Sequence, residues 1–129
     1  MIYVTDTHAI FWFVTQNPRI GQAARLAISD SSARIVIPTI VLAEVAFLSQ
    51  RGRINLDLPT LLRFVRHAVN METYPLDEDT AAILPAILEI HDAIIVATAI
   101  ALRDTSNDRV AVVTRDHNIT VCGLVDVVW

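Results

Sequence analysis

The stretch Ile2-Tyr3-Val4-Thr5 has the composition of a buried strand and is followed at once by the acidic residue Asp6. A later run, Val110-Ala111-Val112-Val113, is followed in the same way by Thr114-Arg115-Asp116. Both runs are rich in β-branched residues, and longer segments with helical periodicity separate them from the other short apolar runs. This alternation predicts an α/β fold with a mainly parallel central sheet.

The same patterns predict the remaining elements. The extended segments are 2–5, 34–37, 73–76, 110–113 and 125–129. The helices are 7–15, 21–29, 39–50, 58–69, 77–88 and 93–103, and residues 104–108 form a polar loop. Asp57 and Asp77 are the expected N-caps of the fourth and fifth helices, and Pro85 is expected to kink or divide the fifth. We therefore expect a three-layer α/β/α sandwich, formed by a single domain over residues 1–129.

The composition excludes several kinds of protein. All ten basic residues are arginine, and the 14 acidic residues give a formal charge of −4. Without lysine there is no Walker-type phosphate loop and no Schiff-base enzyme, and three glycines cannot build a glycine-rich nucleotide cradle. The apolar share of 53% is high for a soluble monomer and indicates a further interface with a partner chain.

The sequence also favours a cytoplasmic protein with no membrane association. The N-terminal segment lacks the basic and apolar regions of a signal peptide, and no apolar stretch approaches the roughly 20 residues that cross a bilayer. The single cysteine, Cys122, cannot form an internal disulfide, which fits a reducing compartment.

Four acidic residues stand out by their positions. Asp6 and Asp116 follow the strands 2–5 and 110–113, and the carboxyl ends of parallel strands meet at the sheet edge where open α/β sheets build their sites. Glu44 lies about one turn into the helix 39–50, on an apolar stripe that we expect to face the core. Asp92 opens the helix 93–103.

Three of the four also have a simpler explanation. Asp6 and Asp92 could be helix N-caps, and Asp116 could form an Asx-turn. Glu44 is harder to explain, because a carboxylate on an apolar stripe must be paired, protonated or metal-bound. Capping does not require four acids to converge at one edge, where they repel each other. The pattern therefore favours a site for a hard divalent cation, Mg²⁺ or Mn²⁺, suited to phosphodiester hydrolysis.

The segments that carry these acids resemble the motifs of the PIN-domain family. Residues 3–12 are similar to its opening "LLDTHxLLW", 41–45 to its mid-chain acidic motif, 91–99 to "DxxIxATA" and 113–116 to "TxD". The motifs occur in the family's order across essentially the whole chain, and this compact form looks most like the VapC-type toxins of VapBC toxin–antitoxin pairs. The serine that many members carry upstream of the mid-chain Glu is not evident, and Thr39 is the nearest candidate.

The resemblance implies an endoribonuclease that depends on Mg²⁺ or Mn²⁺ and cuts structured RNA such as tRNA or rRNA. It also implies a cognate VapB-type antitoxin and a homodimer. The residues it assigns to the catalytic, metal-binding cluster are Asp6, Glu44, Asp92 and Asp116, with Asp6 and Asp116 as the expected direct ligands. Thr7 and Thr114 match polar positions of the family and would orient those ligands.

The roles of four residues near these motifs stay open. Arg115 is a candidate contact to an RNA phosphate, with a surface salt bridge as the alternative. Glu89 is either a peripheral metal ligand or a solvated residue. His91, beside Asp92, could touch the substrate, whereas His8 is expected to pack or to cap a helix.

Two other functional classes compete with a ribonuclease. One is a PIN-fold interaction or RNA-binding module that has lost catalysis, against which the four intact acids argue. The other is a metal-dependent phosphatase of another α/β family, but Asp6 is followed by Thr7-His8 and not by the second Asp of an Asp-x-Asp nucleophile motif. The charge of −4 does not exclude RNA, because the other ten acidic residues equal the ten arginines in number.

Overall fold

A parallel sheet forms the centre of the computed structural model, which describes all residues from Met1 to Trp129. Its strands lie in the order β3-β2-β1-β4-β5, and every neighbouring pair is parallel. The strands are β1 (Ile2–Thr5), β2 (Arg34–Pro38), β3 (Met71–Tyr74), β4 (Val110–Val113) and β5 (Asp126–Val128). The predicted α/β fold with a parallel sheet is confirmed.

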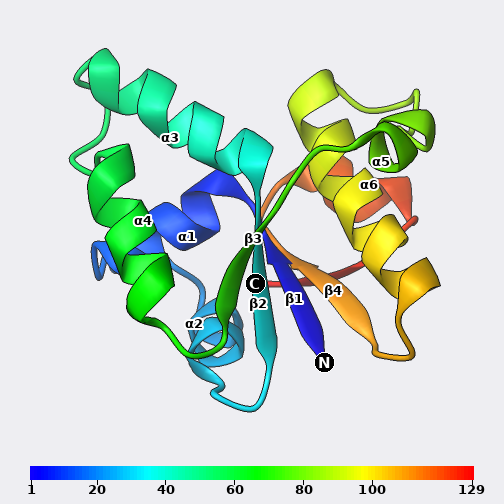
Figure 1. The fold of residues 1–129 in the computed structure, drawn as a ribbon, viewed down its shortest axis with the longest axis horizontal. Coiled ribbons are helices and arrows are strands. Elements are labelled where there is room, and N and C mark those ends of the chain that lie inside the picture. Colours follow the sequence, from blue (N-terminus) through cyan, green and yellow to red (C-terminus); the bar gives the residue numbers. More distant parts are fainter.

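Seven helices accompany the strands. They are α1 (Thr7–Val14), α2 (Gln22–Ser29), α3 (Thr39–Gln50), α4 (Leu58–His67), α5 (Glu78–Ala82), α6 (Ile90–Thr105) and α7 (His117–Cys122). Figure 1 shows α1 to α4 on one side of the sheet and α5 and α6 on the other, which is the predicted three-layer arrangement. None of the helices combines the length and the apolar character needed to cross a membrane.

Strand β1 lies at the centre of the sheet because it is apolar on both faces, as strands of parallel sheets commonly are. Ile2 and Val4 are fully buried, and Val4 pairs with Val36 of β2 on one side and Val112 of β4 on the other. The chain builds outward from β1 through β2 to β3, then crosses to the other side of β1 to form β4 and β5. The order of the strands thus reverses between β1 and β4, and their carboxyl ends mark the position where open α/β sheets form their binding crevices.

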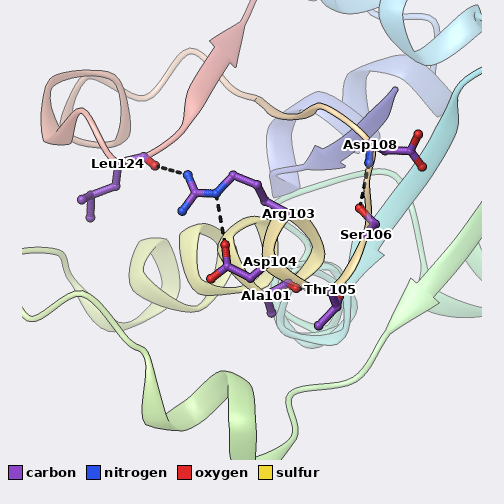
Figure 2. A network of polar contacts seen from close by, with 7 residues as sticks. All are labelled: Ala101, Arg103, Asp104, Thr105, Ser106, Asp108 and Leu124. Carbon is purple, nitrogen blue, oxygen red and sulfur yellow. Dashed lines mark hydrogen bonds and ion pairs between the residues drawn. The ribbon is translucent and has the colours of Figure 1, made fainter.

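Helix α6 is the longest and most deeply buried helix, and it is longer than the sequence predicts. Its end is held by Arg103, whose guanidinium donates to the carbonyl oxygen of Leu124 at 3.1 Å, as Figure 2 shows. The hydroxyl of Thr105 donates to the carbonyl oxygen of Ala101 at 2.7 Å, so the last turn continues into the segment predicted as a loop. The contact of Arg103 ties the end of α6 to the segment that leads into β5.

Two predicted boundaries around α4 and β3 are wrong. The helix ends at His67, and Val69, expected on its buried stripe, is 96% exposed. The side-chain amide of Asn70 donates to the carbonyl oxygens of Asp30 and Ala33, which ties the chain to the start of β2. Pairing with β2 therefore begins at Met71, two residues before the predicted strand.

The helix predicted at 77–88 is much shorter, and one helix was not predicted. Asp77 caps α5 through the Thr80 N–H at 2.8 Å, but the helix ends at Ala82 because proline disfavours helical backbone at the residue before it and lacks an N–H itself. Residues 117–122, for which no element was predicted, form α7, which ends at Gly123 with a φ of +69°. This left-handed conformation is one that glycine adopts without strain.

Candidate functional site

Asp6 is placed at the carboxyl edge by the central strand itself. Its N–H donates to the Val113 carbonyl oxygen at 3.1 Å, which continues the pairing of β1 with β4 by one residue. Its Oδ1 accepts the Ala9 N–H at 2.7 Å, so Asp6 is also the N-cap of α1. Burial raises the pKa of Asp6, against the opposing effects of the hydrogen bonds from Thr114 and Ala9.

Thr114 links Asp6 to Asp116. Its side chain is fully buried, and its hydroxyl donates to Oδ2 of Asp6. The same hydroxyl oxygen accepts the Asp116 N–H at 3.0 Å. One threonine thus holds together the two acidic residues that follow β1 and β4, which is where the strand order reverses.

Asp116 is the N-cap of α7. The local role considered for it, an Asx-turn, thus takes the form of a helix cap. Its Oδ1 accepts the N–H groups of Asn118 at 2.8 Å and Ile119 at 3.1 Å. Its Oδ2 has no hydrogen-bond partner in the protein. This oxygen is therefore free to accept a proton donor or a cation from outside the chain.

Asp92 lies in the first turn of α6 but does not cap it. Glu89 is the cap, since its Oε2 accepts the His91 N–H at 3.0 Å, and the N-cap interpretation of Asp92 is wrong. The pKa of Asp92 is raised to about 6, most by partial burial and then by the charges of Asp116, Glu89, Glu44 and Asp6, in that order. The predicted acids therefore lie close enough to repel one another.

Glu44 does not face the core, and that expectation is wrong. The fully buried residues of α3 are Val41 and Val45, whereas Glu44 is only half-buried. It lines a cavity of about 380 Å³ together with Phe47 of α3 and His91 of α6. Glu44 therefore faces the open space between α3 and the start of α6, where a carboxylate remains hydrated and needs no buried partner.

The four carboxylates fit a hard divalent cation by their chemistry. Mg²⁺ and Mn²⁺ prefer carboxylate and water oxygens, and the site holds no thiolate or imidazole cluster that would favour zinc. The side chains do not yet converge, because no three of the Asp, Glu, His and Cys residues lie close enough together to hold a metal ion. Next to the cluster, the buried Thr7 hydroxyl has no hydrogen-bond partner.

Arg115 does not form the surface salt bridge that was considered for it. It forms no ion pair, so the surface salt bridge is wrong, and its guanidinium carbon lies 4.6 Å from the centre of the Trp12 ring. The His8 ring packs on the same indole at 5.2 Å, as its expected packing role implies. The sequence alone does not predict the contact with Trp12. Trp12 lies in the helix after β1 and Arg115 follows β4, so the two residues come together only when these strands pair.

Comparisons with known proteins agree with this architecture. The model of the family described as PIN domain matches residues 3–122. No curated protein matches the chain. A chain in the crystal structure of VapBC2 from Rickettsia felis, bound to a DNA fragment from their promoter, has a TM-score of 0.67 at 15% identity, covering 98% of this chain and 97% of that one.

A chain in a structure of VapBC-1 from nontypeable Haemophilus influenzae has a TM-score of 0.63, again at 15% identity. The match covers 98% of this chain and 96% of that one. At this identity the two structures establish a common fold, and the family model covers nearly the whole sequence. The chain belongs to the PIN-domain family.

Proposed function

We propose that this protein is a metal-dependent endoribonuclease of the VapC toxin type, which hydrolyses phosphodiester bonds of structured RNA such as tRNA or rRNA. The observation that carries the proposal is the link between Asp6 and Asp116 through the buried hydroxyl of Thr114. It fixes two hard oxygen ligands at the switch point of a parallel sheet, where α/β proteins bind their substrates.

Each acidic residue has a distinct part in this proposal. Asp6 is held by Thr114 and by the Ala9 N–H, so it is the least mobile ligand. Asp116 offers its free Oδ2 as the second. Glu44 and Asp92 approach from α3 and α6, on either side of the edge, and are proposed to bind through water and to accept the proton of the attacking water. Thr7 and Thr114 are proposed to orient these ligands.

Mg²⁺ or Mn²⁺ is the cofactor that this donor set would hold. When bound, such an ion supplies positive charge to the phosphate oxygens and makes a water molecule more acidic. The chain contributes the negative charge that attracts the ion. Its carboxylates repel each other without a cation and would be drawn together by one. Burial is the largest cause of the raised pKa of Asp92, about 6, and repulsion from the neighbouring carboxylates adds to it.

A VapB-type antitoxin is the proposed partner, and a homodimer is the proposed assembly. Both structural neighbours are described as VapBC proteins, which supports a partner of that kind. Large apolar side chains at the surface support burial by another chain: Phe47 is 51% exposed, Ile90 54% and Ile87 74%. Light scattering of the purified chain tests the dimer, and toxicity on expression that a co-expressed antitoxin relieves tests the partner.

The activity is tested by incubating the purified protein with total RNA and Mg²⁺ and mapping the new 5′ ends. We expect discrete cleavage sites, abolished by EDTA and by Asp6→Asn. The substitution keeps the helix cap, since asparagine caps helices as well as aspartate does. Asp126→Asn, on an exposed residue of β5, is the matched control and should cleave like the parent. Cleavage by Asp6→Asn at the parental rate would refute the site, and RNA binding without cleavage would support an inactive PIN-fold module instead.

A further inference from the structure

Arg115 lies next to the acidic residue Asp116 in the chain, yet it forms an ion pair with no carboxylate. The ion pairs that arginine makes in this protein are Arg34 with Glu72 and Arg103 with Asp104. Its side chain is exposed, and its guanidinium donates no hydrogen bond within the chain. The charge of Arg115 is therefore held near the acidic cluster without being neutralised by it.

The indole of Trp12 is what holds this guanidinium. The distance of 4.6 Å from the guanidinium carbon to the ring centre is well within the range of a cation–π contact. A guanidinium on an aromatic ring keeps its N–H groups available around its edge, whereas an ion pair with a carboxylate would occupy them. Stacking thus explains why Arg115 is positioned and still has free donors.

Trp12 is itself a rigid support. It is only 2% exposed, and the Trp129 ring packs against it edge-on at a centroid distance of 5.9 Å. Trp129 in turn lies tightly against Gly21, where an added Cβ would be 2.6 Å from the Trp129 carbonyl carbon. The guanidinium is therefore placed by a stack of packed groups that starts at Gly21 and ends at the rim of the site.

We propose that Arg115 is a phosphate anchor at the rim of the site and that Trp12 is the positioning residue that keeps it out of the carboxylate cluster. The inference rests on the proposed function, since it assumes an RNA substrate. No nitrogen of Arg115 lies within 4.0 Å of a carboxylate oxygen, so its donors are free for a phosphate of the RNA, and the proposal takes that phosphate to be a neighbour of the scissile one. Its effect then falls on substrate binding and not on the reacting group.

Binding is measured with the Asp6→Asn protein, which retains the substrate, against a structured RNA over a series of salt concentrations. We expect Arg115→Ala to raise Kd about tenfold, in keeping with the loss of charge-assisted hydrogen bonds. The slope of log K against log salt should decrease in magnitude by about 1, as expected for the loss of one phosphate contact. Arg109→Ala removes one exposed charge at the opposite edge of the sheet and serves as the matched control. In the cleaving protein, Arg115→Ala should raise KM while kcat stays within about twofold.

Arg115→Lys tests the role of Trp12 without disturbing the core. Lysine keeps the charge but lacks the planar group that stacks on the indole, so we expect most of the loss seen with alanine. Full rescue by lysine overturns the positioning role of Trp12, and an unchanged Kd and salt slope in Arg115→Ala overturn the anchor. If the protein does not cleave RNA but Arg115→Ala still weakens RNA binding, the proposed function fails and the anchor stands. The two failures are therefore distinguishable.

Discussion

Removing the charge of Asp92 should stabilise the metal-free protein, and the size of the effect follows from the site. The pKa of Asp92 rises from 3.8 to about 6 on folding, a difference worth about 3 kcal/mol at 1.36 kcal/mol per pH unit. The side chain is only half-buried, so solvent screening reduces this to about 1.5 kcal/mol. Asp92→Asn also gives up a favourable interaction with the helix dipole of about 0.5 kcal/mol. The net gain is about 1 kcal/mol.

The sign of the pH dependence gives a second, independent check. The folded protein takes up a proton at Asp92 between pH 6 and 3.8, so ionisation destabilises the fold fully above pH 6 and not at all below 3.8. The advantage of Asp92→Asn should therefore be complete at pH 7.5 and vanish at pH 3.8. In a chain of this length, about 1 kcal/mol corresponds to a rise in Tm of about 4 °C.

The assay is thermal unfolding in EDTA at several pH values, with Asp126→Asn as the control for loss of one exposed carboxylate. The control should stay within about 0.5 kcal/mol of the parent. Mg²⁺ should raise the Tm of the parent and close the gap, because the cation takes over the compensation of charge. If Asp92→Asn is no more stable than the parent at pH 7.5, or if its advantage persists at pH 3.8, burial and carboxylate repulsion do not disfavour ionised Asp92 in the folded protein.

Three further perturbations follow from the described contacts. Thr114→Val removes the hydroxyl that bonds to the Asp6 carboxylate and the Asp116 N–H, and should lower the free energy of unfolding by about 2–3 kcal/mol in chemical denaturation. Thr114→Ser keeps the hydroxyl and should lower it far less. Equal losses in the two variants would show that the hydroxyl does not link the two acids. Mn²⁺ should raise the Tm of the parent in proportion to the logarithm of its concentration but not that of Asp6→Asn, and an equal rise in both would place the ion elsewhere. Gly21→Ala must displace Trp129 and should cost about 1–3 kcal/mol and shift the tryptophan emission; an unchanged spectrum would contradict the close packing.

The central part of the fold and the edge that carries the site follow from the sequence. β-branched runs predict β1, β2 and β4, and in a parallel sheet the acids after β1 and β4 must emerge together, as Asp6 and Asp116 do. The orientation of Glu44, which depends on tertiary contacts, was not predicted correctly. Glu44 was assigned to the core because its neighbours are apolar, but the periodicity does not distinguish a stripe facing the core from one lining a cavity.

Local capping was predictable only where the usual residues occur. Asp57 and Asp77 cap their helices as expected, while at α6 the cap is Glu89, a residue type that rarely takes this position. The short helix α7 was missed although its signals are present, since Asp116 and Gly123 bracket it as N-cap and left-handed stop. Six residues are too few for helical periodicity to appear, so the end signals were the only ones available.

The hydrogen bond between Asp6 and Thr114 joins residues that are 108 positions apart, and this has a consequence for the time course of synthesis. A ribosome adding roughly 5–20 residues per second needs on the order of ten seconds for the chain, and the pairing of β1 with β4 becomes available only near the end. Incomplete chains carry Asp6, Glu44 and Asp92 without the strand that brings the fourth acid to them. Under the proposed function, the RNA-cleaving site would therefore be completed only when synthesis of the chain is almost finished.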